Sequence, residues 1–151
     1  MKRILILIVL LLPAWTVSAQ GDLQVGAVFD GKVVPQKAMK ETFIRSSQLA
    51  PYNLEQYHSV SFTGDDQVLA EVSRRVLSDA GKATDQEIHM DSGKLVYAIL
   101  TFESANHDNR FVCYQCVSKA GSYAITLVYM HGPATLDDLK KLFRIVLSTA
   151  E

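Results

Sequence analysis

The sequence lacks an excess of positive charge, and this absence limits the partners that the protein can have. Its 151 residues include 15 lysines and arginines against 16 aspartates and glutamates, which gives a net charge of −1. Nucleic-acid-binding domains carry a basic patch, and electrostatic membrane anchors carry a polybasic segment. The sequence shows neither, so we expect no nucleic-acid partner and no electrostatic anchoring to a membrane.

Familiar catalytic motifs are also missing. The chain contains no G-x-S-x-G, P-loop, GxGxxG or H-E-x-x-H sequence. No second pair of cysteines or histidines has the spacing of metal ligands. Two acidic pairs, Asp65-Asp66 and Asp137-Asp138, resemble paired catalytic carboxylates, but each begins a predicted helix, where helix capping explains it. The sequence therefore predicts no cofactor, no metal and a protein that is more readily explained as a non-enzyme.

Long apolar runs are absent beyond the N-terminus, where one run has the features of a signal peptide. A basic start, Lys2-Arg3, precedes an uninterrupted apolar segment from Ile4 to Leu12. Val17 and Ala19 then occupy the −3 and −1 positions that suit signal peptidase. The apolar segment is shorter than the roughly 20 residues that span a bilayer. We predict a cleaved signal peptide at residues 1–19.

The remaining chain has the length of one domain. Cleavage leaves residues 20–151, with 13 basic against 16 acidic side chains. This length is sufficient for one hydrophobic core. No further apolar run approaches membrane-spanning length. We therefore expect a single exported domain without a membrane span, located in the periplasm or outside the cell.

Three strand-like runs lie between Lys94 and Gly132, joined by the short polar connections ANHDN and AG. Because the connections are too short for helical crossovers, these strands are predicted to be antiparallel neighbours. They carry apolar residues on both faces, so they are either covered on both, or covered on one and stacked with aromatic rings on the other. Weaker strand patterns occur at residues 39–45, 57–63 and 84–90, and a loop is expected at residues 46–52.

Two amphipathic helices complete the predicted fold. The first begins at Asp65 or Thr63 as the cap and runs to about Ala80 with one apolar stripe. The second begins near Thr135, which forms a capping-box pattern with Asp138. A short helix within residues 22–30 is a weaker expectation. The predicted class is α+β, an antiparallel sheet with the two main amphipathic helices packed on one face.

The segment Cys113-Tyr114-Gln115-Cys116 is a CxxC motif, which raises the question of redox chemistry. In thioredoxin-like folds this motif opens a helix, and the helix N-terminus lowers the thiol pKa. Here it lies within RFVCYQCVS, a strand-like run in which residues i and i+3 point to opposite faces with Cα atoms ~10 Å apart. A disulfide needs less than about 7 Å. Two separate core thiols are favoured, while a disulfide across a bulge and a redox pair remain alternatives.

Four tyrosines in the predicted strands and one histidine form a candidate binding surface. Tyrosines that share an exposed sheet face would make an aromatic patch of the kind found at binding surfaces. Cross-strand packing of the same rings beneath the helices is the alternative. The histidine lies at a strand end, before a Gly-Pro pair, where it could face a site at the end of the sheet. The candidate residues are Tyr97, Tyr114, Tyr123, Tyr129 and His131.

Four segments carry a family resemblance: VSAQ at the processing site, YNLEQYHSVSF, GKLVYAILTF and the ending LVYMHGPATLDDLKKLF. With these, the chain resembles small exported proteins of Bacteroidetes bacteria that are assigned to domain-of-unknown-function families. The resemblance covers most of the chain after residue 19. It implies an exported α+β domain, and it brings no catalytic motif to carry over.

The sequence favours a domain that acts by binding, or within an assembly of the cell envelope with another envelope protein as its partner. The motivation is that no convergent set of titratable residues is evident, whereas the strands are rich in tyrosine. Two alternatives remain open. One is a thiol-redox envelope protein that uses Cys113 and Cys116, and the other is a small-ligand binder with a pocket between the sheet and the helices.

Overall fold

The computed structural model describes residues 22–45, 47–103 and 108–141. The predicted signal peptide at residues 1–19 lies outside these ranges, as does the last predicted helix beyond residue 141. Across the described ranges, no helix is both long enough and apolar enough to cross a membrane.

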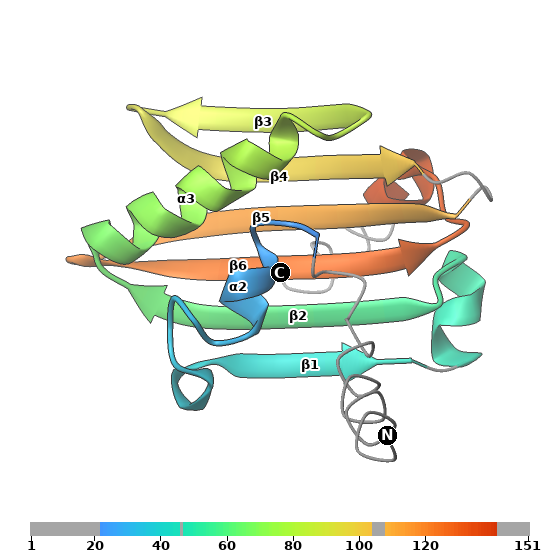
Figure 1. The fold of residues 1–151 in the computed structure, drawn as a ribbon, viewed down its shortest axis with the longest axis horizontal. Coiled ribbons are helices and arrows are strands. Elements are labelled where there is room, and N and C mark those ends of the chain that lie inside the picture. Colours follow the sequence, from blue (N-terminus) through green and yellow to red (C-terminus); the bar gives the residue numbers. More distant parts are fainter. Residues whose placement is uncertain (1–21, 46, 104–107, 142–151) are drawn as a thin grey trace, which may run out of the picture.

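Six antiparallel strands form one sheet in the order β1-β2-β6-β5-β4-β3 (Figure 1). Its three longest strands, β4, β5 and β6, are joined in sequence and pair as antiparallel neighbours, as their short connections predicted. The weaker strand patterns are confirmed as well. The strands are β1 (Lys40–Ile44), β2 (Gln56–Gly64), β3 (Asp85–Asp91), β4 (Lys94–Glu103), β5 (Asn109–Lys119) and β6 (Ser122–Gly132).

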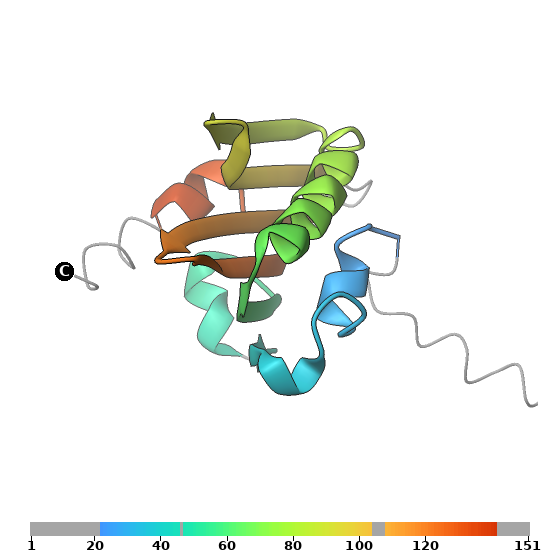
Figure 2. The same ribbon diagram turned by 90° about the vertical axis from the view of Figure 1, so that its left-hand side faces the viewer.

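The helix α3 (Asp66–Ala80) lies across one face of the sheet, which it shares with the short helix α2 (Gly26–Phe29) (Figure 2). Asp65 caps α3 by accepting a hydrogen bond from the Val68 amide at 2.9 Å, as predicted. Apolar residues at helical spacing then face the sheet. This first core includes Val28, Phe29, Val60, Leu69, Val72, Val76, Leu100, Leu127 and Tyr129.

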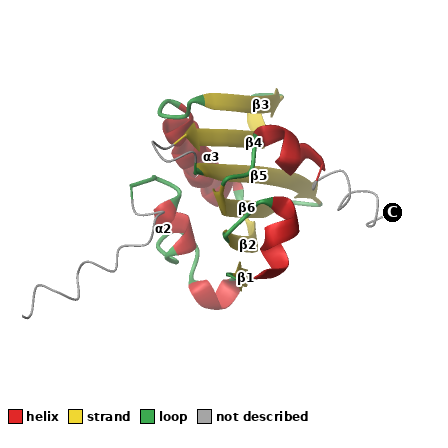
Figure 3. Cartoon of the chain, turned by 90° about the vertical axis from the view of Figure 1, so that its right-hand side faces the viewer, coloured by secondary structure: helices red, strands yellow, loops and turns green. Residues whose placement is uncertain are grey.

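A second core lies on the opposite face, beneath the 3₁₀ helix η3 (Ser47–Tyr52) and the helical residues 136–141 (Figure 3). The predicted capping box is present. The Asp138 amide donates to Thr135 Oγ1 at 3.2 Å, and the Thr135 amide donates to the Asp138 carboxylate at 2.9 Å. The buried members of this core are Leu49, Leu54, Ile99, Phe111, Cys113, Val128, Met130, Ala134 and Leu139.

The α+β class and the antiparallel sheet are confirmed, but the helices are distributed differently from the prediction. The described part of the last helix, residues 136–141, packs on the face opposite α3 rather than beside it. The physical reason is that the central strands are apolar on both faces, so Ile99 and Val128 need a second cover. Residues expected to form a loop contribute to that cover, because η3 places Leu49 in the second core.

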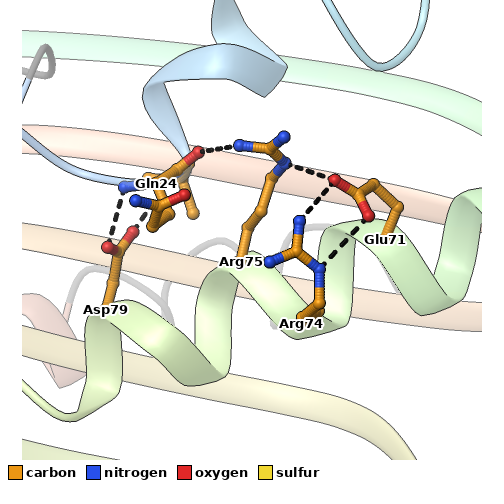
Figure 4. A network of polar contacts seen from close by, with 6 residues as sticks. Gln24, Glu71, Arg74, Arg75 and Asp79 are labelled. Atoms are coloured by element: carbon orange, nitrogen blue, oxygen red, sulfur yellow. Dashed lines mark hydrogen bonds and ion pairs between the residues drawn. The ribbon is translucent and has the colours of Figure 1, made fainter.

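A buried carboxylate on α3 holds the N-terminal described segment in place. Asp79 is fully buried and accepts hydrogen bonds from the amides of Gln24 at 2.8 Å and Val25 at 3.0 Å (Figure 4). One turn earlier, Arg75 donates to the Gln24 carbonyl at 3.1 Å and pairs with Glu71 at 2.8 Å. These contacts satisfy backbone groups of the segment that leads into α2, which would otherwise lack partners at the core boundary.

We predict that Asp79→Ala destabilises the protein by about 2–4 kcal/mol, because it leaves the Gln24 and Val25 amides without their acceptor. Hydrogen exchange at Gly26–Phe29 should accelerate more than exchange in the central strands. Urea unfolding gives the first quantity, and amide exchange gives the second. The matched control is Ser78→Ala, an exposed neighbour on the same helix, which should change stability by less than about 0.5 kcal/mol. Equal stability of the two variants would contradict the assigned role.

Candidate functional site

The two cysteines of the CxxC motif lie on opposite faces of β5. Cys113 belongs to the second core, whereas Cys116 packs against the first core, and neither is in a disulfide. Their separation follows from the two-residue repeat of a strand, which sends residues i and i+3 to opposite sides. Burial raises the pKa of Cys113 to about 12. The structure thus does not bring the two thiols together.

The four candidate tyrosines do not share one surface. Tyr114 and Tyr129 are buried in the first core, and the Tyr114 hydroxyl donates to the Leu95 carbonyl at 3.1 Å. Burial raises the pKa of both phenols. Tyr123 lies half-buried at the edge of the same core and donates to Asp66 at 2.8 Å. Tyr97 is the exception, since it lies on the opposite face and is 36% exposed.

His131 is half-buried at one end of the sheet, where it meets two carboxylates. Its Nδ1 lies 3.7 Å from Glu55 Oε2, and its Nε2 lies 3.9 Å from Asp108 Oδ2. One ligand atom from each of the three residues can be chosen so that all lie within 4.8 Å of one another. Among the described residues, this is the group whose side chains could hold a metal ion.

The strand register aligns one accessible polar residue from each of the six strands. Gln115 lies two residues beyond Cys113, and Tyr97 lies two residues before Ile99, so these side chains share the face of the second core. All members of the set are exposed or half-buried. In order across the sheet the set is Lys40, Ser61, Thr126, Gln115, Tyr97 and His89, which we call the polar row.

The same face becomes apolar toward the other end of the strands. One step along from the polar row, Val128, Cys113 and Ile99 are directly aligned, and the next step brings Met130 beside Phe111. These residues form the second core beneath η3 and residues 136–141. The second face is therefore covered at one end of the sheet, whereas the end that carries the polar row is accessible to solvent.

A groove of about 560 Å³ lies at the β1 end of the polar row. Three lysines line it: Lys37 from the turn η2 (Gln36–Ala38), Lys40 from β1 and Lys119 from the end of β5. No lining residue is acidic. Within the part of the chain that the structure describes, these lysines take part in no salt bridge. Hydroxyl groups complete the lining, from Ser61, Thr63 and Thr126.

Sequence reasoning singled out Tyr97 and His131 as candidates but did not single out the residues around them. The available signal for the polar row was the alternation at residues 57–63, which puts Ser59, Ser61 and Thr63 on one strand face. The lysines gave no signal, because Lys40 and Lys119 come together only through the pairing of β1, β2, β6 and β5.

The fold and the site together define an α+β protein with an antiparallel sheet, helices on both faces and an open polar end on one of them. Residues 12–143 match the model of a family of unknown function (DUF6108), and the chain belongs to this family. The expected membership in a domain-of-unknown-function family is therefore confirmed. No curated protein matches the chain.

We predict that Cys113 reacts with a thiol reagent only on unfolding, whereas the half-buried Cys116 reacts in the native protein. Because burial raises its pKa to about 12, the Cys113 thiol stays protonated at pH 8, and the protonated form is a poor nucleophile. Labelling of Cys116→Ser, which keeps Cys113, should be slow without denaturant, and labelling of Cys113→Ala should be fast. Unreduced protein in denaturant should release two thiols per chain. Fewer than two would indicate a disulfide and contradict the geometry.

Proposed function

We propose that this protein is an exported, non-enzymatic binding domain that holds an extended anionic ligand along the polar row. The observation that carries the proposal is the register, which places an accessible polar side chain from every strand in one line ending at a groove with three lysines. The apolar start of the chain, with its processing site, supports export.

Charge supports an anionic ligand. The chain as a whole has a net charge of −1, so the positive potential of the groove comes from the local gathering of Lys37, Lys40 and Lys119. Lysines without a carboxylate partner attract anions from a distance and raise the rate of association, an effect that salt weakens. Ser61 and Thr126 add hydroxyl donors beside the lysines.

Shape supports an extended ligand. Six strands at a spacing of about 4.8 Å make the polar row roughly 24 Å long. Hydroxyl and amide groups occupy its middle, and an exposed phenol ring at Tyr97 offers a flat surface toward the far end. His89 and Lys40 lie on the two outermost strands, so these two titratable side chains are far apart at opposite ends of the polar row. This spacing suits contact along a chain better than activation of a single bond.

We predict that the double variant Lys40→Glu/Lys119→Glu binds a fluorescent sulfated dextran at least about tenfold more weakly than the unmodified protein. Reversal of both charges turns the attraction in the groove into repulsion. Fluorescence anisotropy at low salt measures the affinity, and binding should weaken as salt is added. Unlabelled neutral dextran should not compete.

The matched control is Lys32→Glu/Lys82→Glu, which changes the net charge equally at two exposed lysines outside the groove. This variant should retain most of the affinity, and thermal unfolding of both double variants should show that they fold. If both double variants lost affinity equally, the net charge of the protein alone would explain the binding, and this result would contradict a site at the groove.

A further inference from the structure

The polar row lies beside exposed apolar surface. Tyr97 belongs to the row itself and is 36% exposed. Val117 lies two residues beyond Gln115 on β5, so its side chain points to the same face, and it is 47% exposed. Opposite Val117 on β6 is Ala124, which lines the groove. The open end of the second face therefore offers apolar contacts next to hydrogen-bonding groups.

The polar side chains in the middle of the row have free hydrogen-bonding capacity. Within the described ranges, the side chains of Ser61, Gln115 and Thr126 form no hydrogen bond with another residue. A hydroxyl group both donates and accepts, and a glutamine amide offers two donors and one acceptor. The strand pairing places the three side chains on the adjacent strands β2, β6 and β5. They can therefore bind several hydroxyl groups of one ligand.

The lysines that serve the polar row lie at its β1 end, in the groove. The side chains in the middle of the row, Ser61, Thr126 and Gln115, carry no charge. Polyphosphate and single-stranded nucleic acid carry a charge on every unit and are bound by basic side chains along their length. The polar row would neutralise only one end of such a ligand. It suits a chain that carries neutral polar groups as well as acidic ones.

The direction of the row does not suit a peptide that binds as an added strand. Such peptides pair with the free edge of a sheet through main-chain hydrogen bonds. The polar row instead crosses the sheet, and its four inner strands each have a neighbour on both sides. Their backbone groups are used in pairing within the sheet. A ligand that lies along the row is therefore held by side chains.

We propose that the extended anionic ligand of the polar row is an acidic polysaccharide. This inference rests on the proposed function and names the chemical class of its ligand. A sugar ring has an apolar face of C–H groups and a rim of hydroxyl groups, so it matches an aromatic ring flanked by hydrogen-bonding side chains. One sugar unit of an extended chain is similar in length to the strand spacing of about 4.8 Å, so roughly four or five units fit along the row.

Each part of the polar row then has a role. The lysines of the groove bind carboxylate or sulfate groups at one end. Toward the other end, Tyr97 stacks on a sugar ring, with Gln115 and His89 beside it on the neighbouring strands. Burial raises the pKa of the Tyr97 phenol, and the neighbouring Cys113 and Glu87 raise it further. The phenol is therefore uncharged at neutral pH and does not repel an anion.

Fluorescence anisotropy with labelled sulfated dextran and with labelled polyphosphate tests the proposal. Tyr97→Ala should weaken the binding of sulfated dextran at least about fivefold, because the ring contact is lost, whereas Tyr97→Phe should retain it. The affinity for polyphosphate should be the same in Tyr97→Ala as in the unmodified protein. In saturation-transfer spectra, sugar C–H protons should receive magnetisation from aromatic protons, and less of it in Tyr97→Ala.

The matched control is Tyr52→Ala, which removes a tyrosine of similar exposure, 40%, from η3 at the covered end of the sheet. It should bind sulfated dextran as the unmodified protein does, and thermal unfolding should show that each variant folds. If Lys40→Glu/Lys119→Glu weakens the binding of sulfated dextran and Tyr97→Ala does not, the anion site is retained and the polysaccharide proposal is wrong. If neither variant changes the affinity, the proposed function itself is wrong. Equal weakening of polyphosphate binding by Tyr97→Ala would also contradict stacking on a sugar.

Discussion

The architecture depends on one constraint, which is that β4, β5 and β6 are apolar on both faces and must be covered on both. α3 and α2 cover the first face. The second cover comes from segments next to the strand ends, since η3 precedes β2 and residues 136–141 follow β6. Both segments attach at the same end of the sheet, because β2 begins where its antiparallel neighbour β6 ends. The second face is consequently buried at one end only.

The second face is open at one end because η3 and residues 136–141 cover only its other end. Where η3 and residues 136–141 do not extend, the polar row carries hydroxyl, amide, phenol and charged side chains, which tolerate water. An exposed polar sheet face is ordinary in antiparallel proteins, and by itself it indicates no ligand. At one end of this face, Lys37 and Lys40 from one segment gather with Lys119 from a distant one and make that end positively charged, which is why it supports binding of an anion.

The elements were predictable from the sequence because their signals are local. Asp65 caps α3 through a residue three positions away, and Thr135 pairs with Asp138 over the same distance. The choice of face for the last helix was not predictable, since it depends on which side of a two-sided sheet remains uncovered. The candidate sites were even harder to predict from the sequence. His131 was singled out by its place at a strand end, but Glu55 comes beside it only through the β2–β6 pairing.

The central claim is that the open end of the second face is the binding surface, and amide chemical-shift mapping during titration with sulfated dextran tests it most directly. The account predicts that the largest shifts occur at Lys40, Ser61, Lys119 and Thr126, which line the groove on four different strands. Shifts concentrated on α3, or spread evenly over the surface, would contradict it.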